Sequence, residues 1–189
     1  ITTFGVMLAT TFFVPSMPIG RKMSYGQQLA VLKKPIVWAA IFAVIFLNGS
    51  IFGVFNYWAA YLTSVAGLVP ALVSLLLFVY GFCNILGSMA AGYLLSHRPQ
   101  TTVKVFPFLL AVLYLLLLTD GSSWPMAAIL TILWGILAGI NANINQFWLS
   151  HAASAAPDFA NGLFLTSANL GTMAATTVSG MFIDCWGME

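Results

Sequence analysis

Five long apolar runs constrain the fold of this chain more than any other feature. They cover 36–62, 70–95, 103–119, 125–149 and 160–183, and residues 1–18 have the character of the end of a sixth run. A membrane-spanning helix needs about 20 mostly apolar residues. Runs this long do not show the alternating polarity of barrel strands, so each is predicted to be a helix. The sequence predicts an all-α integral membrane protein with about six transmembrane helices.

Charge supports the same fold class. Charged residues make up 5% of the chain and hydrophobic residues 61%, whereas soluble domains carry about 25% charged residues. So few charges can serve short loops but cannot coat a surface that faces water. The net charge of +2 gives no reason to expect a nucleic-acid partner. Because the chain begins at Ile1 and stops at Glu189 just after an apolar run, we interpret it as a fragment of a longer protein.

Prolines and one acid mark the breaks between the runs. Proline is tolerated in the first turn of a helix, where its missing N–H costs little. We therefore expect four prolines at or near helix starts: Pro35, Pro70, Pro107 and Pro125. Pro99 is predicted to close the third span, and Asp158 to cap the last one.

The basic residues give the orientation. All six fall in two connections, 20–35 and 96–104: Arg21, Lys22, Lys33, Lys34, Arg98 and Lys104. The connections near 63–69 and 120–124 contain no Lys or Arg. The positive-inside rule then places the loops 20–35, 96–104 and 150–158 in the cytoplasm.

The connection at 20–35 is the longest. Ser24 and Gln27 have the spacing of a capping box, and Tyr25, Leu29 and Leu32 would share one helical face. This pattern favours a short amphipathic helix on the cytoplasmic membrane surface. A plain charged linker is the alternative.

Two spans contain nearly the same hexapeptide. Leu-Gly-Ser-Met-Ala-Ala at 86–91 recurs as Leu-Gly-Thr-Met-Ala-Ala at 170–175, and each follows an asparagine, Asn84 or Asn169. Asn56 and Trp58 near the end of one span are echoed by Asn145 and Trp148 three spans later. This pattern indicates an inverted repeat of three helices plus three, without its last helix. Because these residue types are common in membrane helices, a chance match is the alternative.

Uncharged polar residues enter the spans in a pattern. Asn48, Phe52 and Asn56 follow one helical face, and Asn141, Asn145 and Trp148 follow another. A buried amide without a partner is costly in hydrocarbon, so these groups should face a wet cavity or bond between helices. We predict a substrate cavity for a neutral or amphipathic solute, lined by Asn48, Phe52, Asn56, Asn141, Asn145, Gln146, Trp148 and Asn169.

Chemistry of other kinds is not indicated. The sequence shows no nucleophile elbow, no zinc-protease motif and no pair of acids in the spans, so we expect neither an enzyme nor a cofactor or metal site. His97 and His151 are predicted at cytoplasmic helix ends. Cys83 and Cys185 should lie at different membrane depths, too far apart for a disulfide. Small residues at 87 and 91, and at 171, 175 and 179, are predicted to allow close helix packing.

Taken together in order, several stretches resemble the C-terminal half of a major facilitator superfamily transporter, in the drug and sugar efflux branch that includes arabinose efflux permeases. They are 28–35, 61–68, 87–98, Trp134-Gly135 and 168–180. One departure concerns the loop after Gly92, where the family commonly has Asp before the basic residues and this chain has Ser96, His97 and Arg98.

The resemblance implies a division of the chain into three parts. Residues 1–19 would be the last helix of the N-terminal half, 20–35 the interdomain linker, and 36–189 an incomplete C-terminal bundle of five transmembrane helices. The implied function is secondary active efflux of a sugar or drug by alternating access in the bacterial inner membrane. Its partners would be the solute, the lipid bilayer and the missing N-terminal half, which would supply the acid for proton coupling. A non-transporting scaffold or receptor-like relative of the same fold is the alternative.

Overall fold

The computed structural model describes residues 24–120 and 123–187. Five long helices account for most of this part: α3 (Pro35–Ser64), α4 (Pro70–His97), α5 (Pro99–Asp120), α6 (Trp124–Ala152) and α7 (Pro157–Trp186). Their positions match the five predicted apolar runs to within a few residues at each end. The sixth predicted span, at 1–18, lies outside the described residues.

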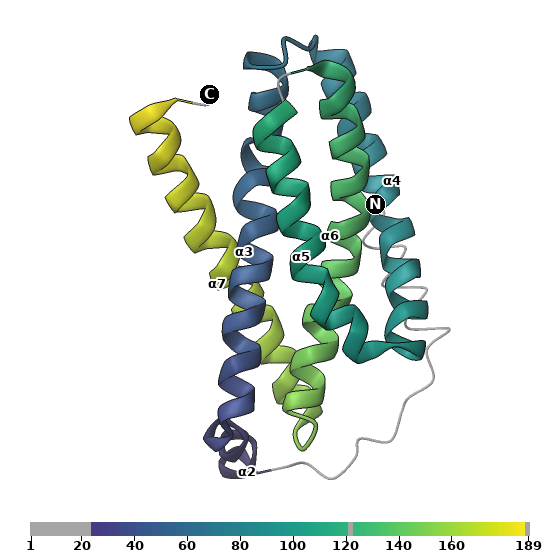
Figure 1. Ribbon diagram of the computed structural model, residues 1–189. Coiled ribbons are helices and arrows are strands. Elements are labelled where there is room, and N and C mark those ends of the chain that lie inside the picture. The colour runs from purple at the N-terminus through teal and green to yellow at the C-terminus, as the bar shows by residue number, and fades with distance from the viewer. Residues whose placement is uncertain (1–23, 121–122, 188–189) are drawn as a thin grey trace, which may run out of the picture.

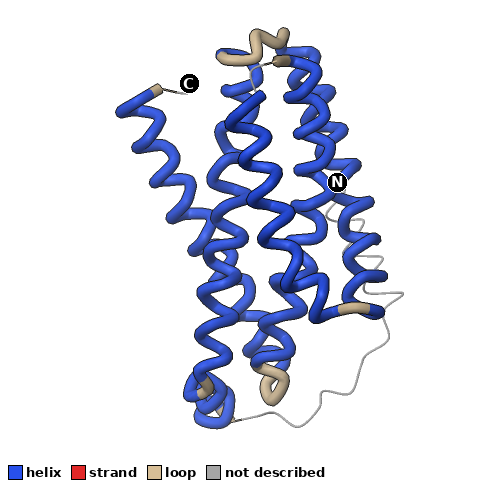
Figure 2. The backbone as a smooth tube through the Cα atoms, in the orientation of Figure 1, coloured by secondary structure: helices blue, strands red, loops and turns tan. Residues whose placement is uncertain are grey.

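Successive helices run in opposite directions, so the connections alternate between the two ends of the bundle (Figures 1 and 2). The connections α4–α5 and α6–α7 lie at the same end as the start of α3, and α3–α4 and α5–α6 lie at the opposite end. The basic residues of the described part, Lys33, Lys34, Arg98 and Lys104, therefore belong to one end. This up-and-down arrangement agrees with the prediction that these basic residues share one side, and which side faces the cytoplasm stays a prediction.

Three of the four predicted proline starts are confirmed. Pro35, Pro70 and Pro125 occupy the first or second position of α3, α4 and α6. Pro107 instead lies inside α5, and Pro99 begins that helix rather than closing α4. Only Arg98 separates α4 from α5, so the predicted loop at 96–104 is almost entirely helical. Membrane helices tolerate an internal proline because neighbouring groups compensate for the lost backbone bond.

One prediction about a helix start is corrected by the structure. Asp158 is not the cap of α7: the capping position is Ala156, which makes no side-chain bond, and Asp158 lies in the first turn. An acid there still interacts favourably with the helix dipole. At the linker, a short α-helix, α2 (Tyr25–Leu29), continues as a 3₁₀ turn, η1 (Ala30–Lys33).

Val31 attaches the linker to the bundle, and it is not one of the residues predicted to share the apolar face of the linker helix. Val31 is buried, whereas Leu29 is 55% exposed and Leu32 is only partly buried. The tight 3₁₀ turn rotates Val31 inward, where it packs with Val37 and Ala40 of α3. The carbonyl of Leu32 also accepts a hydrogen bond from the Trp38 indole at 2.9 Å. Leu29 remains available for the predicted surface contact.

In the described part of the chain, α3, α4, α5 and α6 are long and apolar enough to cross a membrane. The fifth long helix, α7, has 30 residues but is less apolar, because threonine, serine and asparagine recur along it. Its place as a span remains a prediction. In Figure 1 its C-terminal part, in yellow, diverges from α3.

Glycines bring the helices together in two pairs, α4 with α6 and α3 with α7, which are the most extensive contacts of the bundle. A Cβ atom at Gly87 of α4 would meet the backbone carbonyl of Ile136 on α6. A Cβ atom at Gly171 of α7 would meet the carbonyl of Ile45 on α3. The predicted small-residue packing is confirmed at these positions. The two glycines hold the same place in the recurring hexapeptide, which supports the inverted repeat.

The core of the outer half, the half away from the basic residues, is aromatic. The buried Trp134 of α6 packs edge-on against Phe55, Trp58, Tyr80 and Tyr114, with ring centroids 5.2 to 6.3 Å away. These rings come from α3, α4 and α5. Such edge-to-face pairs stabilise a core beyond simple burial. Trp134 thus links four helices at one level.

Candidate functional site

The asparagines of α3 bond to α7. The Asn48 amide nitrogen donates to the Ala168 carbonyl at 2.8 Å and to the Thr172 hydroxyl at 2.9 Å. About two turns further along α3, the Asn56 amide donates to the Thr176 hydroxyl at 2.6 Å. Both residues therefore make interhelical hydrogen bonds, the alternative to cavity lining. Asn48 is buried, while Asn56 remains exposed and accessible from outside the bundle.

The asparagines of α6 differ from those of α3. Asn141 and Asn145 are 1% and 0% exposed. The Asn141 side-chain oxygen and both polar atoms of the Asn145 amide have no hydrogen-bond partner among the described residues. They continue the buried face of α6 that carries Trp134, whose indole N–H also lacks a partner there. An unsatisfied buried polar group costs about 1–3 kcal/mol, so a water molecule or another polar partner would stabilise these groups.

The other predicted cavity residues do not gather around the amides of Asn141 and Asn145. Gln146 is exposed and lines a hollow of about 450 Å³ between α4 and α6, together with Ser96, Asn143 and Ser150. Trp148 is partly buried in the apolar cluster formed by the first turns of α3 and α7. Phe52 and Asn169 are exposed. The structure thus gathers the predicted residues into an α3–α7 group and an α6 group rather than one pocket.

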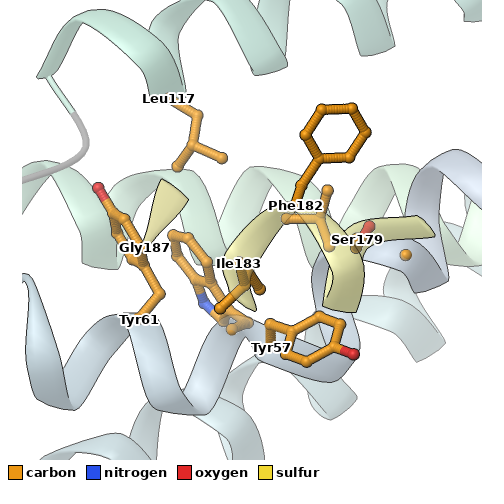
Figure 3. Close-up of a pocket in the computed structure, with 10 residues that line it drawn as sticks. Tyr57, Tyr61, Leu117, Ser179, Phe182, Ile183 and Gly187 are labelled. Atoms are coloured by element: carbon orange, nitrogen blue, oxygen red, sulfur yellow. The ribbon is translucent and has the colours of Figure 1, made fainter. Parts of the chain in front are cut away.

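A pocket that the sequence did not predict lies between the outer parts of α3 and α7 (Figure 3). Its volume is about 360 Å³, and its α3 wall is Tyr57, Trp58 and Tyr61. Trp58 and Tyr61 stack with ring centroids 5.1 Å apart, and the Trp58 indole donates to the Thr131 hydroxyl at 3.0 Å. The opposite wall comes from Ser179, Phe182 and Ile183 of α7, with Leu117 of α5 above.

The spacing of the three aromatic residues on α3 was the only sequence signal for this pocket. Its α7 wall lies more than a hundred residues away in the chain, so helix packing alone brings the two together. The pocket is aromatic, with an aliphatic hydroxyl from Ser179 and phenol hydroxyls from Tyr57 and Tyr61. The Tyr57 hydroxyl donates to the Thr176 carbonyl at 3.1 Å. This chemistry suits an uncharged solute with a flat or apolar part.

The histidines and cysteines fall where the sequence placed them. His97 and His151 stand in the last turns of α4 and α6, with Nδ1 at 2.9 and 3.0 Å from the carbonyls of Tyr93 and Phe147. Both cysteines are free, Cys83 buried in the middle of α4 and Cys185 exposed near the end of α7. The two histidines therefore lie at helix ends, and the two cysteines lie in different helices and form no disulfide.

Comparison with known families decides the identity of the bundle. The family model of the Major Facilitator Superfamily matches residues 1–184, nearly the whole chain. This chain belongs to the major facilitator superfamily. The match confirms the resemblance and the helical membrane fold predicted from sequence. The transporters of this superfamily handle small molecules in lipid bilayers, and four described helices of this chain are long and apolar enough to span a membrane.

Several curated relatives are similar in sequence to this chain. The inner membrane transport protein YdhP of Escherichia coli K12 is 25% identical over 94% of this chain and 46% of its own length. The purine ribonucleoside efflux pump NepI of Salmonella paratyphi B is 22% identical over 93% of this chain and 44% of its own. The transcription regulatory protein OpdE of Pseudomonas aeruginosa is 29% identical over 85% and 40%.

The chain spans less than half the length of these relatives. No solved structure matches it. The relatives include proteins named for efflux and transport.

Proposed function

We propose that this chain is one half of a secondary active transporter that exports a small, uncharged or amphipathic solute by alternating access. The second half, absent from this sequence, would complete the cavity and supply the acid for proton coupling. The direction of transport follows the efflux pumps among the relatives. A purine ribonucleoside, the solute named for one of them, fits the requirement for an uncharged molecule that has both flat and hydroxylated parts.

One observation carries the proposal: the unpartnered amide of Asn145, together with the Asn141 oxygen. A static scaffold would pair such groups between helices, as Asn48 and Asn56 are paired. A transporter changes conformation, and water or solute can satisfy these groups in another state of the cycle. Phe52 and Asn56 of α3 and Asn169 of α7 are exposed, and they would line that cavity once the second half is present.

The test is solute efflux by the full-length protein in proteoliposomes, measured with a radiolabelled purine ribonucleoside and a radiolabelled pentose under an imposed proton gradient. Asn145→Leu should weaken apparent affinity by about two- to twelvefold, the cost of one hydrogen bond to a neutral ligand. Asn161→Leu is the control, because that asparagine is exposed near the start of α7 and is not among the predicted cavity residues. Normal affinity with a lost folded yield in Asn145→Leu would assign the residue to packing.

A second candidate function has an observation in its favour. The name of OpdE indicates that one relative is known as a regulatory protein, and the paired asparagines of α3 suit a non-transporting membrane protein. A folded, full-length protein that moves none of a panel of neutral, cationic and anionic solutes would favour this alternative. Saturable efflux of one of them would exclude it.

We further propose that the loops 20–35, 96–104 and 150–158 face the cytoplasm of a bacterial inner membrane. Single cysteines test this after Cys83 and Cys185 are replaced by serine. Gln100→Cys should resist an impermeant thiol reagent in intact cells, and Ala66→Cys should react. Labelling at position 100 from outside would overturn the orientation.

A further inference from the structure

A narrow apolar groove lies between α4 and α5 at the end of the bundle that carries the basic residues. Its volume is about 280 Å³. Leu94 of α4 and Val105 and Leu109 of α5 form its sides, and Phe106 and Ile140 lie deeper. From Thr101 to Leu109 the groove follows α5 for about 12 Å, at 1.5 Å per residue. An extended hydrocarbon chain is the ligand shape that fits a narrow apolar groove of this length.

The groove is open on the outer surface of the helices. Leu94, Val105 and Leu109 are 36%, 44% and 49% exposed, whereas Phe106 is 2% exposed. The helices that form it, α4 and α5, are among those long and apolar enough to span a membrane. The open side therefore faces the surroundings of a membrane helix, where acyl chains are the available hydrocarbon.

One end of the groove is cationic. Arg98, the single residue between α4 and α5, lines the groove and forms no ion pair or hydrogen bond through its side chain with any residue in the described part of the chain. Thr101 also lines this end. Thr102 is already engaged, donating its hydroxyl to the Arg98 carbonyl at 2.8 Å. An unpaired guanidinium recognises phosphate oxygens well, since its planar fork matches their geometry.

We propose that this groove binds one anionic phospholipid, with an acyl chain along Val105 and Leu109 and the phosphate at Arg98 and Thr101. The charge complementarity is with the anionic cytoplasmic leaflet, which attracts juxtamembrane basic residues. The proposal rests on the orientation given above and not on the transport activity. It assigns to Arg98 a lipid ligand in place of the acidic loop partner that the family commonly provides.

The test is native mass spectrometry of the full-length protein in detergent with dioleoyl phosphatidylglycerol, and with dioleoyl phosphatidylcholine as the neutral lipid. The wild type should retain phosphatidylglycerol preferentially. Arg98→Gln should lower that preference about fivefold, the effect expected of one cation near the headgroups. Lys33→Gln, which removes an exposed lysine at the same end but outside the groove, should leave the preference unchanged.

A second variant tests the acyl chain separately. Val105→Trp fills the groove without changing charge and should reduce retention of both lipids. Equal retention of the two lipids by the wild type, or equal effects of Arg98→Gln and Lys33→Gln, would overturn the proposal. So would undiminished binding in Val105→Trp, or displacement of the lipid by millimolar inorganic phosphate, which would show a phosphate site without a lipid chain.

Discussion

The helix pairs α4–α6 and α3–α7 hold equivalent places in the repeat but are joined by different chemistry. Between α4 and α6 the contact is backbone against backbone, at Gly87, Gly135 and Gly139. A hydrogen bond from the Ser88 side chain to the Gly139 carbonyl crosses this pair, and it is long at 3.4 Å. Between α3 and α7, Asn48 and Asn56 add short hydrogen bonds to the glycine contacts.

This difference shows that close glycine contacts can join two helices either alone or together with polar side chains. Close glycine contacts need no side-chain partner, so they join α4 to α6 as a unit whose stability depends on shape. Polar side chains make α3–α7 a contact that water or a solute can compete for. The less apolar composition of α7 fits that role, because its threonines supply the acceptors.

The largest effect should come from filling a backbone contact. Gly139→Leu would place a side chain against the backbone carbonyl of Asn84 on α4. Overpacking costs about 1–3 kcal/mol or more, and backbone cannot move aside as a flexible side chain can. We expect the yield of monodisperse full-length protein to fall severely. Gly81→Leu on α4 is the control, because an added Cβ there would meet no atom within 4 Å. Equal yields of the Gly139→Leu and Gly81→Leu proteins would contradict the account.

A smaller effect is expected from removing a polar link. Asn48→Leu deletes two hydrogen bonds to α7. Such bonds average about 0.6 kcal/mol in membrane proteins, so the free energy of unfolding in mixed micelles should fall by about 1–2 kcal/mol. Ser88→Ala, on the other helix pair, should cost less than about 0.5 kcal/mol because its bond is long. The reverse ranking would remove the distinction between the pairs.

The same chemical change one helix away should cost almost nothing. Asn145→Leu replaces an amide that has no partner in the described part of the chain with an apolar group of similar size. Removing an unsatisfied group is nearly neutral or stabilising. We expect the free energy of unfolding to change by less than about 0.5 kcal/mol. A loss as large as that of Asn48→Leu would reveal a structural partner for this amide.

The sequence predicted the five long helices well, because each corresponds to its own run of apolar residues and some begin with a proline such as Pro35 or Pro70. Pro107 was misplaced because the same residue signals a helix start and is tolerated inside a membrane helix. Spacing along one helix also predicted the glycine contacts of Gly87 and Gly171, since small residues on one face indicate where a neighbour comes close.

The grouping of the polar residues could not be predicted in this way. Helical spacing puts Asn141 and Asn145 on one face, but it does not say which helix that face meets. Asn48 reaches Thr172 across more than a hundred residues of chain, and the aromatic wall of Tyr57 and Tyr61 gains its opposite wall from α7. Such pairings depend on how the helices pack, which local pattern does not encode.

The most direct test of the central claim is a double-mutant cycle on the α3–α7 contact. The free energy of unfolding of the full-length protein would be measured for Asn48→Leu, Thr172→Val and the double variant. A bonded pair should show a coupling of about 0.6 kcal/mol, with a ceiling near 1.7 kcal/mol. The same cycle with Asn145→Leu and Thr172→Val should give a coupling near zero. A coupling indistinguishable from zero for Asn48 and Thr172, or an equal coupling for Asn145, would contradict the claim that Asn48 links α3 to α7 whereas Asn145 does not.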